Sequence, residues 1–423
     1  MRKHNPIRQK ILWCIAVLIF CLSLSLVRWA KGISLAAGVQ SGPQGVAKSD
    51  EEITKPGRAL LQQIRHISSE SYSRVIMDLS AEVQYETRVL KEDISKSLPP
   101  RIYVDLRGAR LAMDASQPIV VHDRLLRQVR VGQFSPDVVR VVLDMKSLRE
   151  HRAFLLPEPY RLIIDIQGDG EGSEPLLREK GKVAPPPAAK KVPPVGIRKI
   201  VLDPGHGGKD TGAIGVGGLT EKEIVLSLAK KLARKLTKEM GVEVVLTRRD
   251  DSFIHLPDRT AIANAENADL FISLHTNASP HRHARGIETY YLDNTDDEAS
   301  LRLAARENGI SRKNVSDIQF ILSDLIQNYK LEDSIGLAHH LQSSLVSHME
   351  KRYGGMKDLG VKKAGFYVLV GAKMPSVLVE ILFITHSVEG RQLGKSAYQD
   401  AIVESLYRGI KKYRDSSLVV KSL

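Results

Sequence analysis

Short apolar runs alternate with helical patterns along the second half of the chain, and this alternation restricts the fold more than any other feature. The apolar runs predict strands at residues 199–203, 242–247, 270–274, 286–292, 365–370 and 377–382. Apolar residues at helical spacing predict helices at residues 222–238, 257–267, 334–351 and 397–413. Because strands that alternate with helices form a mostly parallel sheet covered on both faces, we predict an α/β domain over residues 198–415, with a mixed, mostly parallel sheet flanked by helices.

The first half of the chain repeats a different pattern four times. Residues 74–79, 101–106, 140–145 and 161–166 each begin with Arg, continue with apolar or β-branched residues and place Asp one residue before the end. Such alternation is typical of strands with one buried face. The similar spacing within the first and second pair of copies predicts two similar halves packed as an all-β sandwich over residues 60–168. Chance similarity among ordinary strands is the alternative explanation. The pattern contains no catalytic motif, so binding is the expected role of this domain.

The two ends of that domain are marked by changes in composition. Residues 169–197 are rich in Gly, Pro, Ala and Lys, which predicts a semi-rigid linker between the two domains. Residues 1–36 begin with four cations before Ile11, continue with an apolar run from Ile11 to Val27, and end in the small-x-small sequence Ser34-Leu35-Ala36. This order predicts an export signal. The apolar run is short for a spanning helix, but a retained N-terminal anchor stays open as an alternative.

Charge and cysteine content limit the partners. Both cysteines, Cys14 and Cys21, lie in the predicted signal, so the exported chain has no disulfide. The formal net charge is +13, and the four cations that precede the apolar run account for part of it, since 13 − 4 = +9. A positive chain suits an anionic polymer or a membrane surface. Nucleic acid is not expected as a partner because exported proteins rarely meet it.

Three residues of the second domain have the composition of a catalytic zinc site. His206 follows a predicted strand in the Gly-rich sequence Asp203-Pro204-Gly205-His206-Gly207-Gly208, Glu221 opens a predicted helix, and His275 ends another predicted strand. Two imidazoles and one carboxylate with an open fourth position are typical of catalytic zinc, whereas structural sites are closed by four ligands and usually contain cysteine. The ends of neighbouring parallel strands are also where such folds bind ligands.

Two glutamates need to be distinguished from structural carboxylates. Thr220 and Glu223 have the spacing of a capping box, which would occupy Glu223 structurally and leaves Glu221 as the better metal ligand. Glu380 lies within an otherwise apolar predicted strand, where an unpaired carboxylate is costly to bury. Beside a metal it would instead serve as the general base and acid of a hydrolase.

Together these motifs resemble the zinc-dependent N-acetylmuramoyl-L-alanine amidases, the type-3 family of bacterial cell-wall enzymes. The resemblance implies that His206, Glu221 and His275 bind Zn²⁺ and that Glu380 is catalytic. The implied reaction is hydrolysis of the amide between muramic acid and the L-alanine of the stem peptide. Segments 285–291 and 363–369 also match the family and are expected to line the substrate groove.

The candidate groove contacts in this family framework are Asn277, Glu288 and His386. The sequence that follows Glu380 departs from the family at two positions. Leu382 replaces a common glycine, and His386 stands where the family often has asparagine. These changes put the substrate contacts in doubt, but they leave the glutamate in place.

The β-sandwich and a long connection resemble parts of the division-associated members of this family. The layout of residues 60–168 resembles the AMIN domain, a targeting module that implies contact with peptidoglycan and with septal or envelope components. Residues 296–333 resemble a regulatory insertion, with predicted helices at 299–308 and 315–328. From its length and acidic residues we hypothesise autoinhibition, with Glu307 or Glu298 at the open metal position. The resemblance also implies a LytM-like activator and a periplasmic location.

Two other functions remain as alternatives at this stage. A zinc peptidase that cleaves within the stem peptide would use the same ligands, so only its products would distinguish it. A catalytically silent wall-binding scaffold is less compatible with an intact ligand set and Glu380.

Overall fold

The computed structural model describes residues 58–168, apart from 94, 96, 97 and 122, together with residues 196–311 and 330–420. The predicted signal, nearly all of the predicted linker and the predicted helix 315–328 lie outside these residues. Within them, no helix has the length and apolarity needed to span a bilayer.

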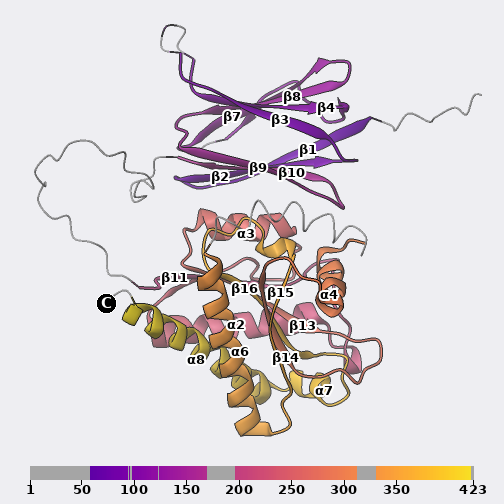
Figure 1. The fold of residues 1–423 in the computed structure, drawn as a ribbon, viewed down its shortest axis with the longest axis vertical. Coiled ribbons are helices and arrows are strands. Elements are labelled where there is room, and N and C mark those ends of the chain that lie inside the picture. The colour runs from indigo at the N-terminus through magenta and orange to yellow at the C-terminus, as the bar shows by residue number, and fades with distance from the viewer. Residues whose placement is uncertain are drawn as a thin grey trace, which may run out of the picture. The chain divides into compact units, whose positions relative to one another are not determined.

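The first domain is a sandwich of two five-stranded sheets, shown as two layers of arrows in Figure 1. One sheet has the order β5-β1-β2-β10-β9 and the other β3-β4-β8-β7-β6. Alternate residues of the central strands face inward and form one apolar core between the sheets, which includes Val75, Val104, Val141 and Ile164. The strands are β1 (Ala59–Ser68), β2 (Tyr72–Leu79), β3 (Gln84–Leu90), β4 (Arg101–Arg107), β5 (Ala109–Leu111), β6 (Ile119–Val120), β7 (Leu126–Ser135), β8 (Val138–Met145), β9 (Glu150–Leu156) and β10 (Arg161–Gln167).

The four repeated Arg…Asp segments are the central strands β2, β4, β8 and β10, which confirms the all-β sandwich. The first copy pairs with the fourth and the second pairs with the third, in antiparallel register. This register places each Arg opposite the Asp of its partner strand, as in Arg140 with Asp105, whose Nε and Oδ1 atoms are 2.6 Å apart. Each sheet therefore takes one copy from each half of the repeat.

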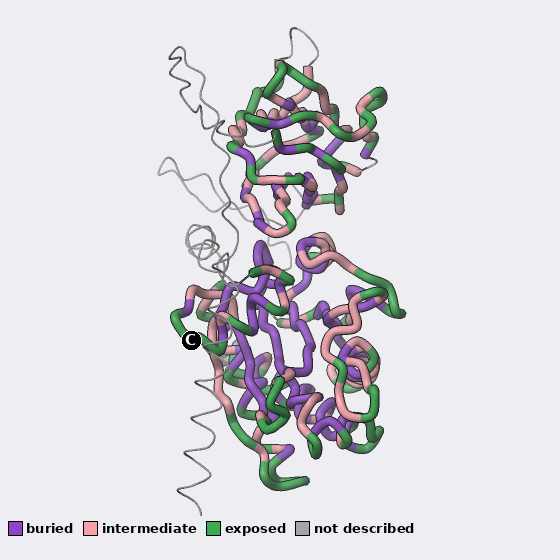
Figure 2. Tube along the Cα trace, turned by 90° about the vertical axis from the view of Figure 1, so that its right-hand side faces the viewer, coloured by how far each residue is buried: buried purple, intermediate pink, exposed green. Residues whose placement is uncertain are grey.

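The second domain is built on a six-stranded mixed sheet of order β12-β11-β13-β16-β14-β15. Four of its five strand pairs are parallel, and only β14 with β16 is antiparallel, which confirms the predicted fold class. Figure 2 shows buried chain concentrated in the central strands of this sheet. The strands are β11 (Lys199–Pro204), β12 (Glu243–Leu246), β13 (Leu270–Asn277), β14 (Ile287–Leu292), β15 (Asp358–Ala364) and β16 (Ser376–Phe383).

Helices cover the sheet through two separate apolar clusters. The larger cluster joins the sheet to α2, α6 and α8, and the smaller one contains residues of α3, α4 and η3. The helical elements are η2 (Val216–Gly218), α2 (Glu221–Met240), α3 (Leu256–Ala265), α4 (Glu298–Asn308), α6 (Leu331–Tyr353), η3 (Tyr367–Leu369), α7 (Glu389–Leu393) and α8 (Ser396–Val420).

The predicted strand at residues 365–370 is wrong. The strand in this region is β15, which ends at Ala364, and residues 367–369 instead form the short helix η3. Tyr367, Val368 and Leu369 are all buried in η3, so the apolar run reflects burial of a turn on the sheet's flank rather than a strand. A continuous apolar run does not by itself distinguish these two cases.

Candidate functional site

His206 is presented by the sharp turn that follows β11. Its backbone has φ 60°, a left-handed conformation that side-chain-bearing residues seldom adopt outside functional or turn positions. Gly205 lets the turn approach the second imidazole, since a Cβ there would lie 2.4 Å from the ring of His275. Nδ1 of His206 lies 2.9 Å from Oδ2 of Asp210, which orients the ring and leaves Nε2 facing the site.

Glu221 is the first residue of α2 and is almost fully buried. Two backbone N–H groups, those of Ala213 and Thr276, donate to its two carboxylate oxygens at 2.9 Å each. The predicted capping box is wrong, because the Thr220 side chain makes no cap bond to the helix backbone and its hydroxyl donates to Glu223 instead. Glu223 is nevertheless held structurally, and Glu221 faces the two histidines.

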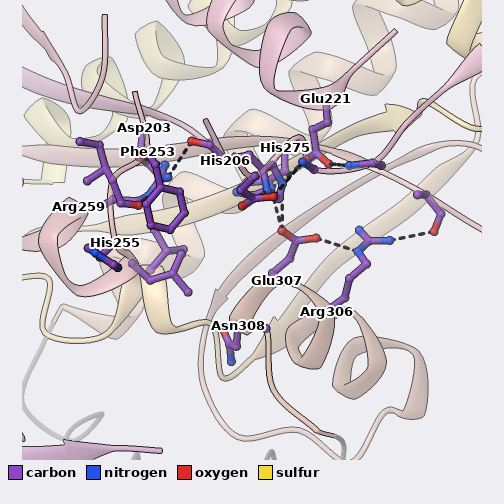
Figure 3. A pocket seen from close by; sticks show the side chains of 18 of the residues that line it. Asp203, His206, Glu221, Phe253, His255, Arg259, His275, Arg306, Glu307 and Asn308 are labelled. Carbon is purple, nitrogen blue, oxygen red and sulfur yellow. Dashed lines mark hydrogen bonds and ion pairs between the residues drawn. The ribbon is translucent and has the colours of Figure 1, made fainter. Parts of the chain in front are cut away.

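His275 completes a set of three convergent side chains, which Figure 3 shows pointing toward one another. It lies near the end of the fully buried strand β13. Oε1 of Glu221 is 3.1 Å from Nε2 of His206 and 3.1 Å from Nδ1 of His275. The three residues singled out in the sequence are therefore brought together, although they are up to 69 positions apart (275 − 206).

A fourth donor comes from Glu307 in the last turn of α4. Its Oε2 is 3.4 Å from Nε2 of His206 and 3.1 Å from Nδ1 of His275. The four donor atoms all lie within 4.8 Å of one another, so this group has the size and chemistry to hold a metal ion. Glu298, the other carboxylate considered for this position, is 62% exposed at the start of the same helix and pairs with Arg302.

The electrostatics of the four residues also favour a cation at their centre. Burial opposes the charged form of Glu221, but His206 and His275 outweigh it and lower its pKa to about 2. Burial likewise opposes protonation of His275, yet Glu307 and Glu221 raise its pKa to about 9. Nε2 of His206 and Oε2 of Glu307 are buried without a hydrogen-bond partner among the described residues. Two buried carboxylates thus demand positive charge at the point where two imidazole nitrogens converge.

Glu380 lies on β16 beside this group, in the register position opposite His275. It is fully buried, and neither carboxylate oxygen has a hydrogen-bond partner in the described part of the chain. Burial and then the negative charge of Glu307 raise its pKa well above the ordinary value. The nearest cation is Arg306, whose Nη2 lies 3.8 Å from Oε1 of Glu380 while its Nε lies 2.9 Å from Oε1 of Glu307.

A buried polar network behind the turn supports the site, and the sequence analysis did not identify it. Asp203 is fully buried and accepts hydrogen bonds from Thr247, Arg259 and Ser273. Arg259 also donates to the backbone oxygens of Pro204 and His206. The available signal was a charged residue at position 259, one helical turn before Ala263 on the buried face of the predicted helix 257–267.

The three candidate groove residues take structural partners. The side chain of Asn277 donates to Glu288, which also accepts a 2.7 Å bond from Lys362. Glu288 is the direct cross-strand neighbour of Glu380. His386 accepts the backbone N–H of Glu389 at 3.3 Å, at the start of α7. None of these three residues lines the cavity beside His206.

The departure from the family at Leu382 falls on a strained backbone position. Leu382 is fully buried with φ 65°, in the left-handed region that glycine occupies without penalty. For a leucine this conformation costs about 1–2 kcal/mol. Its side chain packs into the main core of the domain, so the lost glycine is offset by apolar burial.

A cavity of about 610 Å³ opens next to the four donors. Its wall contains His206, Glu221, His275 and Glu307 together with apolar residues such as Phe253 and Val368. A convergent donor set, a buried carboxylate and an adjoining cavity are the arrangement that metal-assisted hydrolysis requires.

Comparison with known proteins relates this arrangement to characterised families. The sequence profile of N-acetylmuramoyl-L-alanine amidases matches residues 200–412, and that of the AMIN domain matches residues 63–166. The chain is 30% identical over 384 residues to N-acetylmuramoyl-L-alanine amidase AmiC of Neisseria meningitidis serogroup B, covering 83% of this chain and 89% of that protein. It is also 30% identical to AmiC of Escherichia coli O6:H1, covering 83% and 88%. Among solved structures, AmiC2 of Nostoc punctiforme is 33% identical over 51% of this chain and 96% of that chain, with a TM-score of 0.39.

Proposed function

The chain belongs to the N-acetylmuramoyl-L-alanine amidase family and carries an AMIN domain, and we propose that it is a zinc-dependent, self-inhibited enzyme of peptidoglycan remodelling at cell division. The observation that carries the proposal is the convergence of His206, Glu221 and His275, each through one donor atom, beside the buried carboxylate of Glu380. The proposed reaction is hydrolysis of the amide between N-acetylmuramic acid and L-alanine of the stem peptide.

The metal role of the three residues is supported by their donor chemistry. His206, Glu221 and His275 would hold Zn²⁺; Asp210 orients His206, and two backbone N–H groups orient Glu221. When bound, zinc supplies a Lewis acid that polarises the amide carbonyl and lowers the pKa of water. The absence of cysteine from this group favours a catalytic role over a structural one.

Glu380 is proposed to move the proton. Its carboxylate would accept a proton from the attacking water and pass it to the departing nitrogen of L-alanine. Burial keeps this carboxyl in a low-dielectric environment and without competing hydrogen-bond donors among the described residues, which raises its pKa and suits it to take up a proton. The adjoining cavity provides the space for the substrate's amide.

The structure is proposed to represent the inhibited state. Glu307 occupies the position that a substrate or water would need, and its charge also raises the pKa of Glu380. Both effects oppose catalysis, so activity requires α4 to move. A LytM-like activator that binds the insertion is the proposed cause of this movement, with the periplasm as the proposed location and the septum as the site to which the AMIN domain brings the enzyme.

Product analysis on purified sacculi tests this function. We expect stoichiometric zinc in the purified chain and, from the Glu307→Ala variant, free stem peptides that begin with L-alanine. Glu380→Ala in the same background should retain zinc and release no peptides. Fragments cut within the stem peptide would instead identify a zinc peptidase. A folded Glu307→Ala variant with zinc but no products would contradict the proposed activity.

A further inference from the structure

The AMIN domain and the end of α4 share one apolar cluster. Residues 58–420, where described, belong to a single compact unit of the fold. Within it, Ile76, Phe154, Leu156 and Ile163 of the AMIN domain are buried against Tyr367 and Val370 of the amidase domain. Ile310, two residues beyond the last residue of α4, packs against the same cluster. The segment that follows α4 thus packs partly against the AMIN domain.

Polar contacts at three points hold this segment and η3 in place. The carboxylate of Glu158 accepts the backbone N–H of Ser311 at 2.9 Å. The hydroxyl of Tyr367 donates to the backbone oxygen of Pro157 at 3.0 Å. The side chain of Asn308, the last residue of α4, accepts the backbone N–H of Tyr367 at 2.8 Å and donates to the oxygen of Gly365. A continuous set of contacts therefore joins the turn after β9 to the residue next to Glu307.

The domains are anchored to each other at a second place, beside the start of α3. Arg74 is fully buried and forms two bonds of 2.6 and 2.7 Å with Asp165 of its own sheet. Its remaining nitrogen donates to the backbone oxygen of Pro257 and to the hydroxyl of Thr260 in the amidase domain. A buried guanidinium is tolerated only with such full pairing, so this contact belongs to a defined docked state rather than to a loose tether.

We propose that the docked AMIN domain is a working part of the autoinhibitory device, because it holds the C-terminal end of α4 and thereby keeps Glu307 at the metal centre. Glu158, Ile310 and Tyr367 are the positioning residues of this coupling. The proposal rests on the blocking role of Glu307 proposed above, and it extends that role to a domain otherwise assigned only to targeting. Any ligand that favours the undocked AMIN domain would, by linkage, also favour release of α4.

Backbone hydrogen exchange in the full-length chain tests the coupling without reference to catalysis. We compare the wild type with Ile310→Ala and Glu158→Asn. Asn is chosen at position 158 because it tolerates the positive φ of this position. Phe134→Ala is the matched control, since Phe134 is 62% exposed on the other sheet of the same domain. Loss of one such contact should increase exchange of the α4 amides about three- to tenfold, while exchange in β13 stays unchanged. The control should behave as the wild type.

Activity without an activator provides the second measurement. If Glu307 blocks the site, Ile310→Ala and Glu158→Asn should each raise basal hydrolysis of sacculi about three- to tenfold, as for the exchange of α4. Glu307→Ala should raise it further. Wild-type α4 exchange in folded Ile310→Ala and Glu158→Asn chains would overturn the coupling. If hydrogen exchange in β13 also increases in either variant, the variant has destabilised the whole domain. Tyr367→Phe is then the deciding variant, because it removes only the bond to Pro157. A third outcome is that α4 exchanges faster in these variants while zinc-loaded Glu307→Ala is inactive. This outcome would uphold the coupling and reject the proposed function.

Discussion

Oε2 of Glu307 lies 3.1 Å from Nδ1 of His275, although Glu307 lies in the last turn of α4 and His275 in the fully buried strand β13 of the sheet. The carboxylate is 5% exposed and is held there by both imidazoles and by Arg306. Burial alone would raise the pKa of Glu307, but His275, His206 and Arg306 outweigh it and keep that pKa well below its ordinary value. The residue is therefore an ionised carboxylate at the position that we propose catalysis needs free.

Replacing Glu307 by Ala should activate the enzyme. Removing a competing ligand of this kind is expected to raise hydrolysis by about 5- to 150-fold, the range of typical coupling free energies. Release of dye from labelled sacculi measures the rate, and elemental analysis checks that zinc is retained. Glu298→Ala is the matched control on the same helix, because Glu298 is 62% exposed and pairs with Arg302 rather than with the two histidines. Equal rates for both variants and the wild type would contradict the blocking role.

Replacing Glu380 by Gln should abolish most of the activity without loss of metal. Gln keeps the shape of the side chain but cannot accept the proton, so the rate in the Glu307→Ala background should fall about 10²- to 10⁴-fold. Glu332→Gln, at an exposed position near the start of α6, should leave the rate unchanged. A fall of less than about threefold for Glu380→Gln would assign proton transfer to another group.

Replacing Asp203 by Asn should destabilise the amidase domain. Arg259 would then be a buried cation without its counter-ion, and breaking such a pair costs about 3–5 kcal/mol in the free energy of unfolding. Urea denaturation followed by circular dichroism measures this loss. Asp251→Asn provides the comparison, since Asp251 is 60% exposed and its pair with Lys222 should contribute little to the free energy of unfolding. Similar losses for both variants would show that burial of the pair does not decide its energy.

Glu389 should make the stability of the protein depend on pH. Burial raises the pKa of this carboxyl to about 7, although it accepts the backbone N–H groups of Phe383 and Gly286. Since the folded state binds the proton more tightly than the unfolded chain, this stabilisation is full below about pH 4.5 and is lost as the pH rises through about 7. A shift from about 4.5 to 7 corresponds to roughly 3–4 kcal/mol.

The Glu389→Gln variant isolates this contribution. We expect the melting temperature of the wild type to fall relative to that of the variant between pH 5 and pH 8, as measured by thermal denaturation at matched ionic strength. The difference between the two chains matters, because other carboxylates titrate equally in both. Parallel pH profiles would show that Glu389 is not protonated in the folded state.

Much of the site could be predicted because its residues lie close in sequence to the end of a strand or the start of a helix. His206, Glu221 and His275 each lie at the end of a strand or the start of a helix, where the local pattern of apolar residues fixes the position of the side chain relative to the sheet. The same reasoning identified Glu380, because a carboxylate in an apolar strand demands an explanation. The parallel sheet then brings the strand ends together, so the prediction of the fold carried the prediction of the site with it.

Other features depended on which surfaces meet. The sequence allowed either Glu298 or Glu307 to reach the metal position, and packing of Leu303 and Ala304 into the flanking cluster decided for Glu307. The apolar residues 367–369 looked like a strand but form the buried turn η3, in which Tyr367 packs against the AMIN domain while Val368 and Leu369 pack within the amidase domain. The pairing of Arg74 with both Asp165 and the start of α3 had no signal beyond the repeated Arg…Asp pattern.

The two fold classes, the donor residues and the buried glutamate could be predicted from short segments of sequence, because they depend on periodicity and on residue chemistry. Only the folded chain shows that Glu307 rather than Glu298 lies beside the two histidines, which domain surface contacts the segment after α4 and which buried charges pair. Hydrophobic patterning encodes that a residue is buried, but the hydrophobic effect is non-directional and does not specify the partner that buries it.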